Sequence, residues 1–155
     1  MARKPAKKTL KLSKVVEGKK KINEFSEYIW NEEENEIIKY NKVFDRAIIE
    51  ELTLELFNDM QEAINKKFAY FENDDQLFKY ELLLIIKHFT HFKDEIGDTF
   101  EEKITALEAL MSVGLFDLFY EEVFSKDEVA RVINKVNEVA EKAMVALDVI
   151  EKSKK

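Results

Sequence analysis

Glycine and proline are so scarce in this chain that they constrain its fold more than any other feature. The 155 residues include three glycines and one proline. Both residue types interrupt helices, glycine through its conformational freedom and proline through its missing backbone donor. Their scarcity, beside abundant Glu, Lys, Leu and Ala, favours helices. Gly97 and Gly114 each follow a helical pattern, where a left-handed residue would end the helix, and Gly18 is expected in a turn.

Apolar residues at three- and four-residue spacing predict a series of helices after residue 45. The first spans about residues 46–67, with Asp45 as its cap, and "ENDD" at 72–75 separates it from a second over 76–95. The expected apolar faces comprise Ile49, Leu52, Leu56, Met60 and Ile64 in the first helix and Phe78, Leu82, Ile85, Phe89 and Phe92 in the second.

Capping signals predict the remaining helices. Thr99 and Glu102 are spaced as a capping box, and that helix should end at Gly114. A short aromatic segment follows over 115–124, and "SKDE" at 125–128 opens a last helix that reaches about residue 151. These segments predict a mainly α fold, a compact domain of about four to six helices over residues 22–152.

The N-terminal part, up to about residue 44, is harder to interpret. "TLKLSKVV" and "EIIKYNKVF" have β-like alternation, and "NEEEN" could connect two strands. An extended hairpin and a helix over 22–34 are both compatible with this pattern. Residues 1–21 are expected to form a basic arm outside the helical domain.

Composition excludes several classes of protein. The chain has no cysteine, which rules out disulfides, thiolate metal sites and a cysteine nucleophile. Its longest apolar run, residues 82–86, is far shorter than the ~20 residues of a membrane span, and the basic start lacks the apolar region of a signal peptide. We therefore expect a cytoplasmic protein that is neither secreted nor bound to membranes.

Charge is distributed unevenly along the chain. Residues 1–21 hold nine Lys and Arg against Glu17, a net charge of +8, so the rest of the chain carries −15. The arm could bind nucleic acid or rest on the acidic domain. The residues that would contact nucleic acid are Arg3, Lys4, Lys7, Lys8, Lys19, Lys20 and Lys21.

The two histidines, in "KHFTHF", are the only weak candidates for a metal site. On a helix His88 and His91 lie one turn apart, with Glu81 and Glu95 on the same flank. The spacing lacks the glutamate of H-E-x-x-H and the paired Glu-x-x-His of di-iron bundles, which favours a structural role. Phosphate-binding loops and nucleophile elbows are also missing, so we predict a protein without enzymatic activity or cofactor.

Two segments have the composition of interaction surfaces. Residues 115–124 are mostly apolar, more than one buried helix face requires, so a second face either is buried or meets a partner. The last helix has a narrow apolar seam that either packs on its own domain or meets a partner, including a second copy. The candidate contact residues are Leu115, Phe116, Phe119, Tyr120, Val129, Ile133, Val136 and Leu147.

Several stretches resemble the tail assembly chaperones of long-tailed phages and prophages of Gram-positive bacteria. They are "KYNKVFDRAIIEELTLEL", "FENDDQLFKY", "IIKHFT", "TFEEKI" and "GLFDLFYEEVF", which together cover about residues 37–137. None contains a catalytic signature, because they consist mostly of capping and core positions.

The resemblance implies a non-enzymatic assembly factor of helical fold, located in the cytoplasm of the host cell if a phage encodes it. Such proteins bind the tape measure protein, keep its apolar helices from aggregating and help recruit tail tube subunits. The alternative is a phage or prophage regulator that binds nucleic acid through the basic arm.

Overall fold

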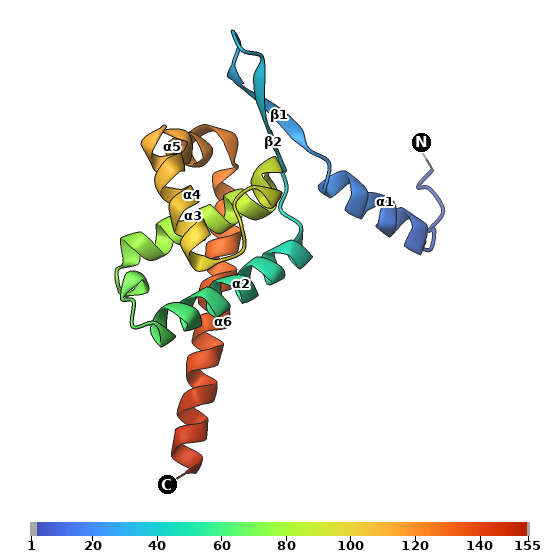
Figure 1. The fold of residues 1–155 in the computed structure, drawn as a ribbon. Coiled ribbons are helices and arrows are strands. Elements are labelled where there is room, and N and C mark those ends of the chain that lie inside the picture. Colours follow the sequence, from blue (N-terminus) through green and yellow to red (C-terminus); the bar gives the residue numbers. More distant parts are fainter. Residues whose placement is uncertain (1–2, 155) are drawn as a thin grey trace.

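The computed structural model describes residues 3–154, apart from the side chains of Met144, Leu147, Asp148 and Glu151. The fold is mainly α, as predicted, with one antiparallel hairpin (Figure 1). The elements are α1 (Leu12–Ile22), β1 (Ser26–Asn31), β2 (Glu36–Tyr40), α2 (Arg46–Asn65), α3 (Asp74–Phe89), α4 (Phe100–Ser112), α5 (Leu115–Leu118) and α6 (Lys126–Ser153), with short turns η1 (Tyr70–Glu72), η2 (His91–Asp94) and the π-helical η3 (Phe119–Val123).

Helix α3 is the centre of the body. Every residue from Tyr80 to Lys87 is buried, because α2, α4 and α6 all contact this helix. A helix that is apolar on nearly all sides is stable only when neighbours surround it. The apolar run at 82–86 is therefore a core helix, and no helix among the described residues is both long and apolar enough to cross a bilayer.

The predicted helix ends are largely confirmed. The side chain of Asp45 accepts a hydrogen bond from the Ala47 N–H at 2.9 Å, and that of Thr99 accepts one from the Glu102 N–H at 3.1 Å. Asn73 caps α3, which begins at Asp74, two residues before the expected start. Gly97 and Gly114 adopt left-handed backbone conformations, with φ of 89° and 79°.

Helix α3 ends earlier than predicted, at Phe89 instead of residue 95. Thr90 is extended and pairs with Tyr40 of the hairpin, while the Asn41 N–H donates to the Phe89 carbonyl at 2.9 Å. The pairing of Thr90 with the hairpin thus takes the place of the last helical turns that were predicted up to residue 95. The predicted apolar face of α2 is also shorter than expected, because Ile64 is 67% exposed.

The N-terminal part resolves into a helix and a hairpin. β1 and β2 confirm the hairpin alternative, and the helix over 22–34 is wrong; Asn35 has φ of 58° in the connecting turn. "LSKVV" is helical despite its alternation, so Gly18 lies inside α1 rather than in a turn. Lysines 19–21 occupy the last turn of α1, where the helix dipole favours positive charge.

The aromatic segment after Gly114 turns back onto the core. Phe119 is fully buried and stacks on Phe124 with ring centroids 5.2 Å apart. Phe124 in turn meets the edge of Phe44, which stacks on Phe89 at 4.1 Å. These rings join the start of α2, the end of α3 and the segment before α6 in one core.

Phe119→Ala should destabilise the fold. It removes a fully buried ring, which costs about 3–5 kcal/mol in the free energy of unfolding. Urea denaturation followed by circular dichroism measures this change. Val113→Ala, at a side chain 60% exposed, is the control and should change stability little. A Phe119→Ala protein as stable as the wild type would contradict the placement of this ring.

Candidate functional site

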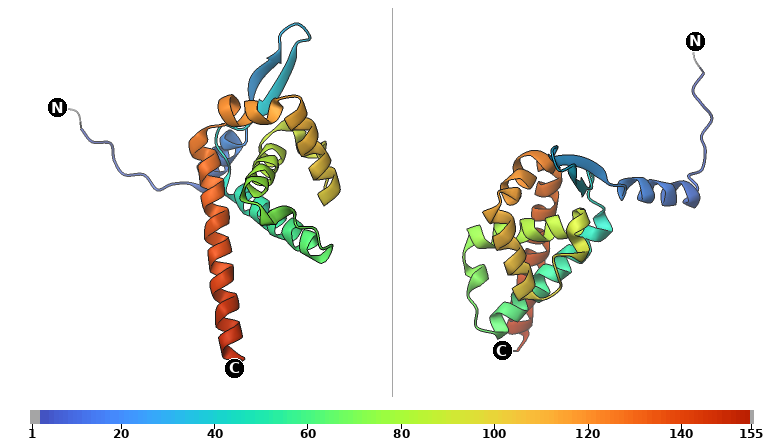
Figure 2. Two further views of the ribbon diagram at one scale, coloured as in Figure 1. Left: turned by 90° about the vertical axis from the view of Figure 1, so that its left-hand side faces the viewer. Right: turned by 45° about the horizontal axis from the view of Figure 1, so that its top comes forward.

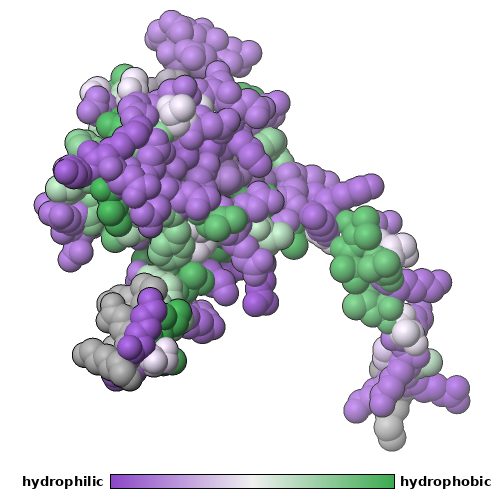
Figure 3. Space-filling model, turned by 60° about the horizontal axis from the view of Figure 1, so that its bottom comes forward, coloured by the Kyte–Doolittle hydropathy of each residue, from purple (hydrophilic) through white to green (hydrophobic). Residues whose placement is uncertain are grey.

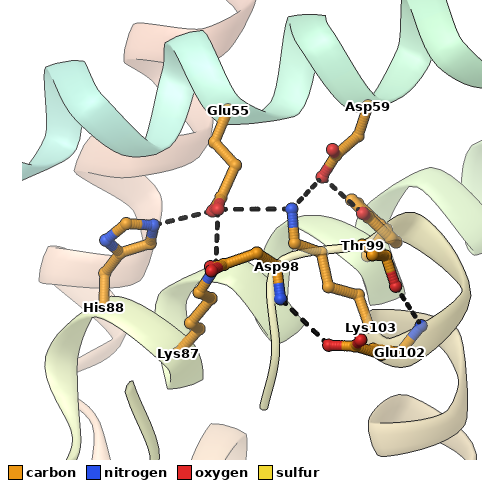
Figure 4. Close-up of polar contacts among 9 residues, drawn as sticks. Glu55, Asp59, Lys87, His88, Asp98, Thr99, Glu102 and Lys103 are labelled. Carbon is orange, nitrogen blue, oxygen red and sulfur yellow. Dashed lines mark hydrogen bonds and ion pairs between the residues drawn. The ribbon is translucent and has the colours of Figure 1, made fainter. Parts of the chain in front are cut away.

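The most polar part of the interior is a buried ionic cluster where α2, α3 and α4 meet (Figure 4). Lys103 is 1% exposed and Lys87 4%, although lysine is rarely buried without a partner. Glu55 and Asp59 lie one turn apart on α2 and point toward these lysines. The cluster is therefore assembled from three helices.

Glu55 is the centre of the buried ionic cluster. Its carboxylate lies 2.6 Å from the Lys87 ammonium and 2.7 Å from Nε2 of His88, both on α3. The same group lies 3.2 Å from the Lys103 ammonium of α4. One carboxylate thus joins all three helices.

Asp59 forms the second half of the buried ionic cluster. It accepts a hydrogen bond from the Lys103 ammonium at 2.8 Å and one from the Tyr80 hydroxyl at 2.5 Å. Burial and the hydrogen bond to Asp59 raise the pKa of Tyr80 well above its usual range. Tyr80 is therefore a neutral donor throughout the physiological range of pH.

The electrostatics of the buried ionic cluster favour its charged form. Burial alone would raise the pKa of Glu55, but the hydrogen bonds from His88 and Lys87 outweigh it and lower this pKa to about 2. Burial opposes the charge of Lys87 as well, and its hydrogen bond to Glu55 still raises its pKa. The carboxylates and the lysines of the cluster balance one another's charges. The cluster is therefore suited to holding the three helices together.

The two histidines do not form a shared site. His88 is engaged by Glu55, while Nδ1 of His91 accepts a hydrogen bond from the Lys39 N–H of the hairpin at 3.2 Å. The His91 ring lies on Phe92, with centroids 4.2 Å apart. Among the described residues, no group of three or more His, Asp or Glu side chains is arranged to hold a metal ion.

The residues expected at a protein interface divide between core and surface. Phe116, Phe119, Val129 and Val136 are buried within this chain, so they contact its own helices. Leu115, Tyr120 and Ile133 are half-buried at the edge of the core, and the Leu147 side chain lies outside the described residues. The first half of the α6 seam thus packs on its own domain, which was one of the two predicted arrangements.

The basic residues of the arm are exposed. Residues 3–11 have no regular secondary structure, and α1 has no buried residue. The candidates Arg3, Lys4, Lys7, Lys8, Lys19, Lys20 and Lys21 all lie on this projecting arm.

An apolar surface around Phe68 was not predicted from the sequence. Phe68 is 51% exposed and separates two open hollows of about 500 and 410 Å³. The first is lined by Met60, Ile64 and Phe71 among others, and the second by Phe100 and Ile104. We call these six residues the Phe68 surface. The aromatic run "FAYF" between two helices was the signal that could have indicated it.

Glu55→Gln tests the buried ionic cluster. The substitution leaves buried Lys87 with only the exposed Asp98, at 3.3 Å, and buried Lys103 with Asp59 alone, which should cost up to about 3–5 kcal/mol at pH 7. Because the pKa of Glu55 is lowered from 4.5 to about 2, its contribution to stability is present above pH 4.5. The difference from wild type should shrink as the pH falls through this range. Glu50→Gln, at an exposed position of α2, is the control. Equal differences at pH 7 and pH 2.5 would contradict the assignment.

Glu81→Gln should have the opposite effect. Burial raises the pKa of Glu81 from 4.5 to about 7, so the folded state loses stability as the pH rises through this interval. The neutral amide avoids that loss, and the variant should be more stable than wild type at pH 8 by up to about 3 kcal/mol. At pH 4 the two proteins should differ little. Urea denaturation at both values measures this, and a variant less stable at pH 8 would refute the prediction.

Comparison with known proteins identifies a family. The model of the YomO family matches residues 12–155, nearly the whole chain. No curated protein and no solved structure matches the chain. The chain therefore belongs to the YomO family, whose name is associated with phages and prophages.

Proposed function

We propose that this YomO-family protein is a non-enzymatic assembly factor that binds helices of another protein, as a phage tail assembly chaperone does. Its client would be the tape measure protein, and it would help to recruit tail tube subunits. The phage association of the family and the resemblance over about residues 37–137 support this proposal.

The Phe68 surface is the observation that carries the proposal. Ile64 and Phe68 are 67% and 51% exposed, and the hollows beside Phe68, of about 500 and 410 Å³, each have room for apolar side chains of a partner. An amphipathic helix binds such a groove through apolar anchors one turn apart. Two adjacent hollows would accept two anchors and shield them from water.

Charges on the rim of the Phe68 surface would set the register of a client helix. Lys66 bridges Glu62 of α2 and Glu101 of α4, with distances of 2.8 and 2.7 Å. Glu72 and Glu108 lie beside the two hollows. Because rim charges affect orientation and association rate more than affinity, a client with basic residues flanking its apolar face would fit best.

Co-expression with helical fragments of the candidate tape measure protein tests this function. The wild type should keep a fragment in solution and co-elute with it in size-exclusion chromatography with light scattering. Ile64→Asp/Phe68→Asp should abolish co-elution, because it places charges where apolar anchors bind.

Leu54→Asp, at another side chain of α2 that is 63% exposed, is the matched control and should bind normally. A wild type that leaves every fragment insoluble would refute the proposal. Equal binding by the Phe68 variant would place the client elsewhere, first at the half-buried Leu115 and Tyr120.

The exposed arm favours a second candidate, a regulator that binds nucleic acid. Its basic residues are exposed. They would release counterions from phosphates on binding, so affinity for duplex DNA should fall steeply with salt. Fluorescence anisotropy of wild type and a variant lacking residues 1–21 measures this. Binding that disappears with the arm would support this function over chaperoning.

A further inference from the structure

The hairpin contains a strand whose outer edge has no partner among the described residues. β1 pairs with β2 alone, whereas β2 also pairs with Thr90 through Tyr40. No backbone hydrogen bond joins residues 25–31 to a described segment outside the hairpin. The donors and acceptors on the free side of β1 are therefore open to another strand.

This free edge is unprotected along most of its length. Edge strands are commonly blocked by lysine, proline or a bulge, and β1 contains neither lysine nor proline. Its pairing is regular from Ser26 to Ile29, and the irregularity lies between Ile29 and Asn31, near the turn. Phe25, Ile29 and Trp30 are 50%, 61% and 39% exposed. Because a hairpin of two strands is marginally stable in water, a third strand that covers these side chains would stabilise it.

Charge is fully separated between the arm and the hairpin. Residues 1–16 contain six Lys and Arg and no carboxylate, whereas residues 22–38 contain six glutamates and no Lys or Arg. All twelve side chains are exposed, and none forms an ion pair with another described residue. A hydrogen bond with Glu34 raises the pKa of Glu36, so the like charges at the turn are crowded. The two segments are therefore electrostatically complementary.

Residues 6–11 of the arm have the length of one added strand. They lie between Pro5, which cannot donate to a ladder, and the start of α1, and they have no regular secondary structure. Figure 3 shows hydrophobic side chains gathered on the otherwise hydrophilic arm, where Leu10 is 67% exposed. In a strand Leu10 would lie on the face opposite to Lys7 and Lys11. The segment thus offers an apolar side chain to β1 and lysines to the glutamates of the hairpin.

The arm is too short to pair with the hairpin of its own chain. The Asn23 side chain donates to the Asp45 carboxylate at 2.8 Å, and buried Asn41 donates to the Glu24 carbonyl at 3.3 Å. From this fixed point the arm and the hairpin diverge (Figures 1 and 2). α1 is about 16 Å long, and residues 6–11 span at most about 20 Å. A segment that folded back along α1 would use most of its length before it reached the base of β1.

We propose that the protein forms a dimer by strand exchange, in which residues 6–11 of each copy add to the free edge of β1 of the other. The added strand pairs the open backbone groups of β1, covers its apolar side chains and compensates the glutamates of the hairpin. The contact is made twice about a two-fold axis. It is independent of the proposed client, because the Phe68 surface takes no part in it.

Light scattering across a dilution series of the full-length protein tests the dimer. The wild type should have twice the chain mass of 18.3 kDa and dissociate on dilution. Because salt screens exposed charges, the dissociation constant should rise by about tenfold or more between about 0.1 and 1 M NaCl. A wild type that is monomeric at every concentration would overturn the proposal. If the arm of that monomer bound duplex DNA, its partner would be nucleic acid instead.

Charge reversal on either side of the contact should weaken the dimer. Lys7→Glu/Lys8→Glu places carboxylates opposite the glutamates of the hairpin, and Glu32→Lys/Glu33→Lys places cations opposite the arm. Each variant should raise the dissociation constant by about tenfold or more, since like charges then face each other in both contacts. All four positions are exposed, so the circular dichroism of the body should not change.

Mixing the two variants distinguishes pairing of the arm with the hairpin from other dimers. A mixed pair has one wild-type contact and one in which the charges of both sides are reversed, so the mixture should form heterodimers although each variant alone dissociates. Glu50→Lys/Glu51→Lys, at exposed positions of α2, is the charge-matched control and should dimerise as the wild type does. A mixture that associates no better than its components would overturn the proposal, as would an equally weakened control.

Amide hydrogen exchange tests whether the contact is an added strand. The amides of β1 that face the free edge should exchange more slowly in the wild-type dimer than in Lys7→Glu/Lys8→Glu at the same concentration, because the added strand accepts their hydrogen bonds. Equal exchange rates in the two proteins would rule out strand addition.

Discussion

The pairing of Glu55 with Lys87, His88 and Lys103 is the interaction on which the arrangement of the body depends. It joins α2 to α3 and to α4 through one carboxylate, at distances from 2.6 to 3.2 Å. Removing charges from water is costly, and only good geometry with several hydrogen bonds compensates for it. A displacement of α2 by one turn would leave Lys87 and Lys103 buried without Glu55. The buried ionic cluster therefore restricts the three helices to one register, whatever its net contribution to stability.

That register determines where the exposed features lie. Phe68 follows the end of α2 and packs edge-on against Phe100 of α4, with ring centroids 5.7 Å apart. Both hollows of the Phe68 surface are lined by residues of α2, and one of them also by α4. Because the buried ionic cluster fixes α2 against α4, the hollows have a defined shape before any partner arrives. A preformed groove loses less conformational entropy on binding than one that must assemble.

Features encoded by neighbouring residues could be predicted from the sequence, and those that depend on distant partners could not. The caps at Asp45 and Thr99 and the left-handed glycines need only a few adjacent residues. Glu55 and its partners on α3 are 32 and 33 residues apart, so no local pattern identifies the pair, and His88 suggested a metal instead. The α6 seam keeps its alternating four- and three-residue spacing from Val129 to Ile150, but among its described side chains only those of the first half are buried or half-buried. The point at which α6 leaves the body depends on the size of the body. The periodicity of the sequence holds no information about that size.

The buried ionic cluster lies inside the body, while most of the exposed large apolar side chains lie on the arm, the hairpin and the distal half of α6, which project from it. Elements with few tertiary contacts are the least stable part of a fold, so a binding partner has the greatest influence on them.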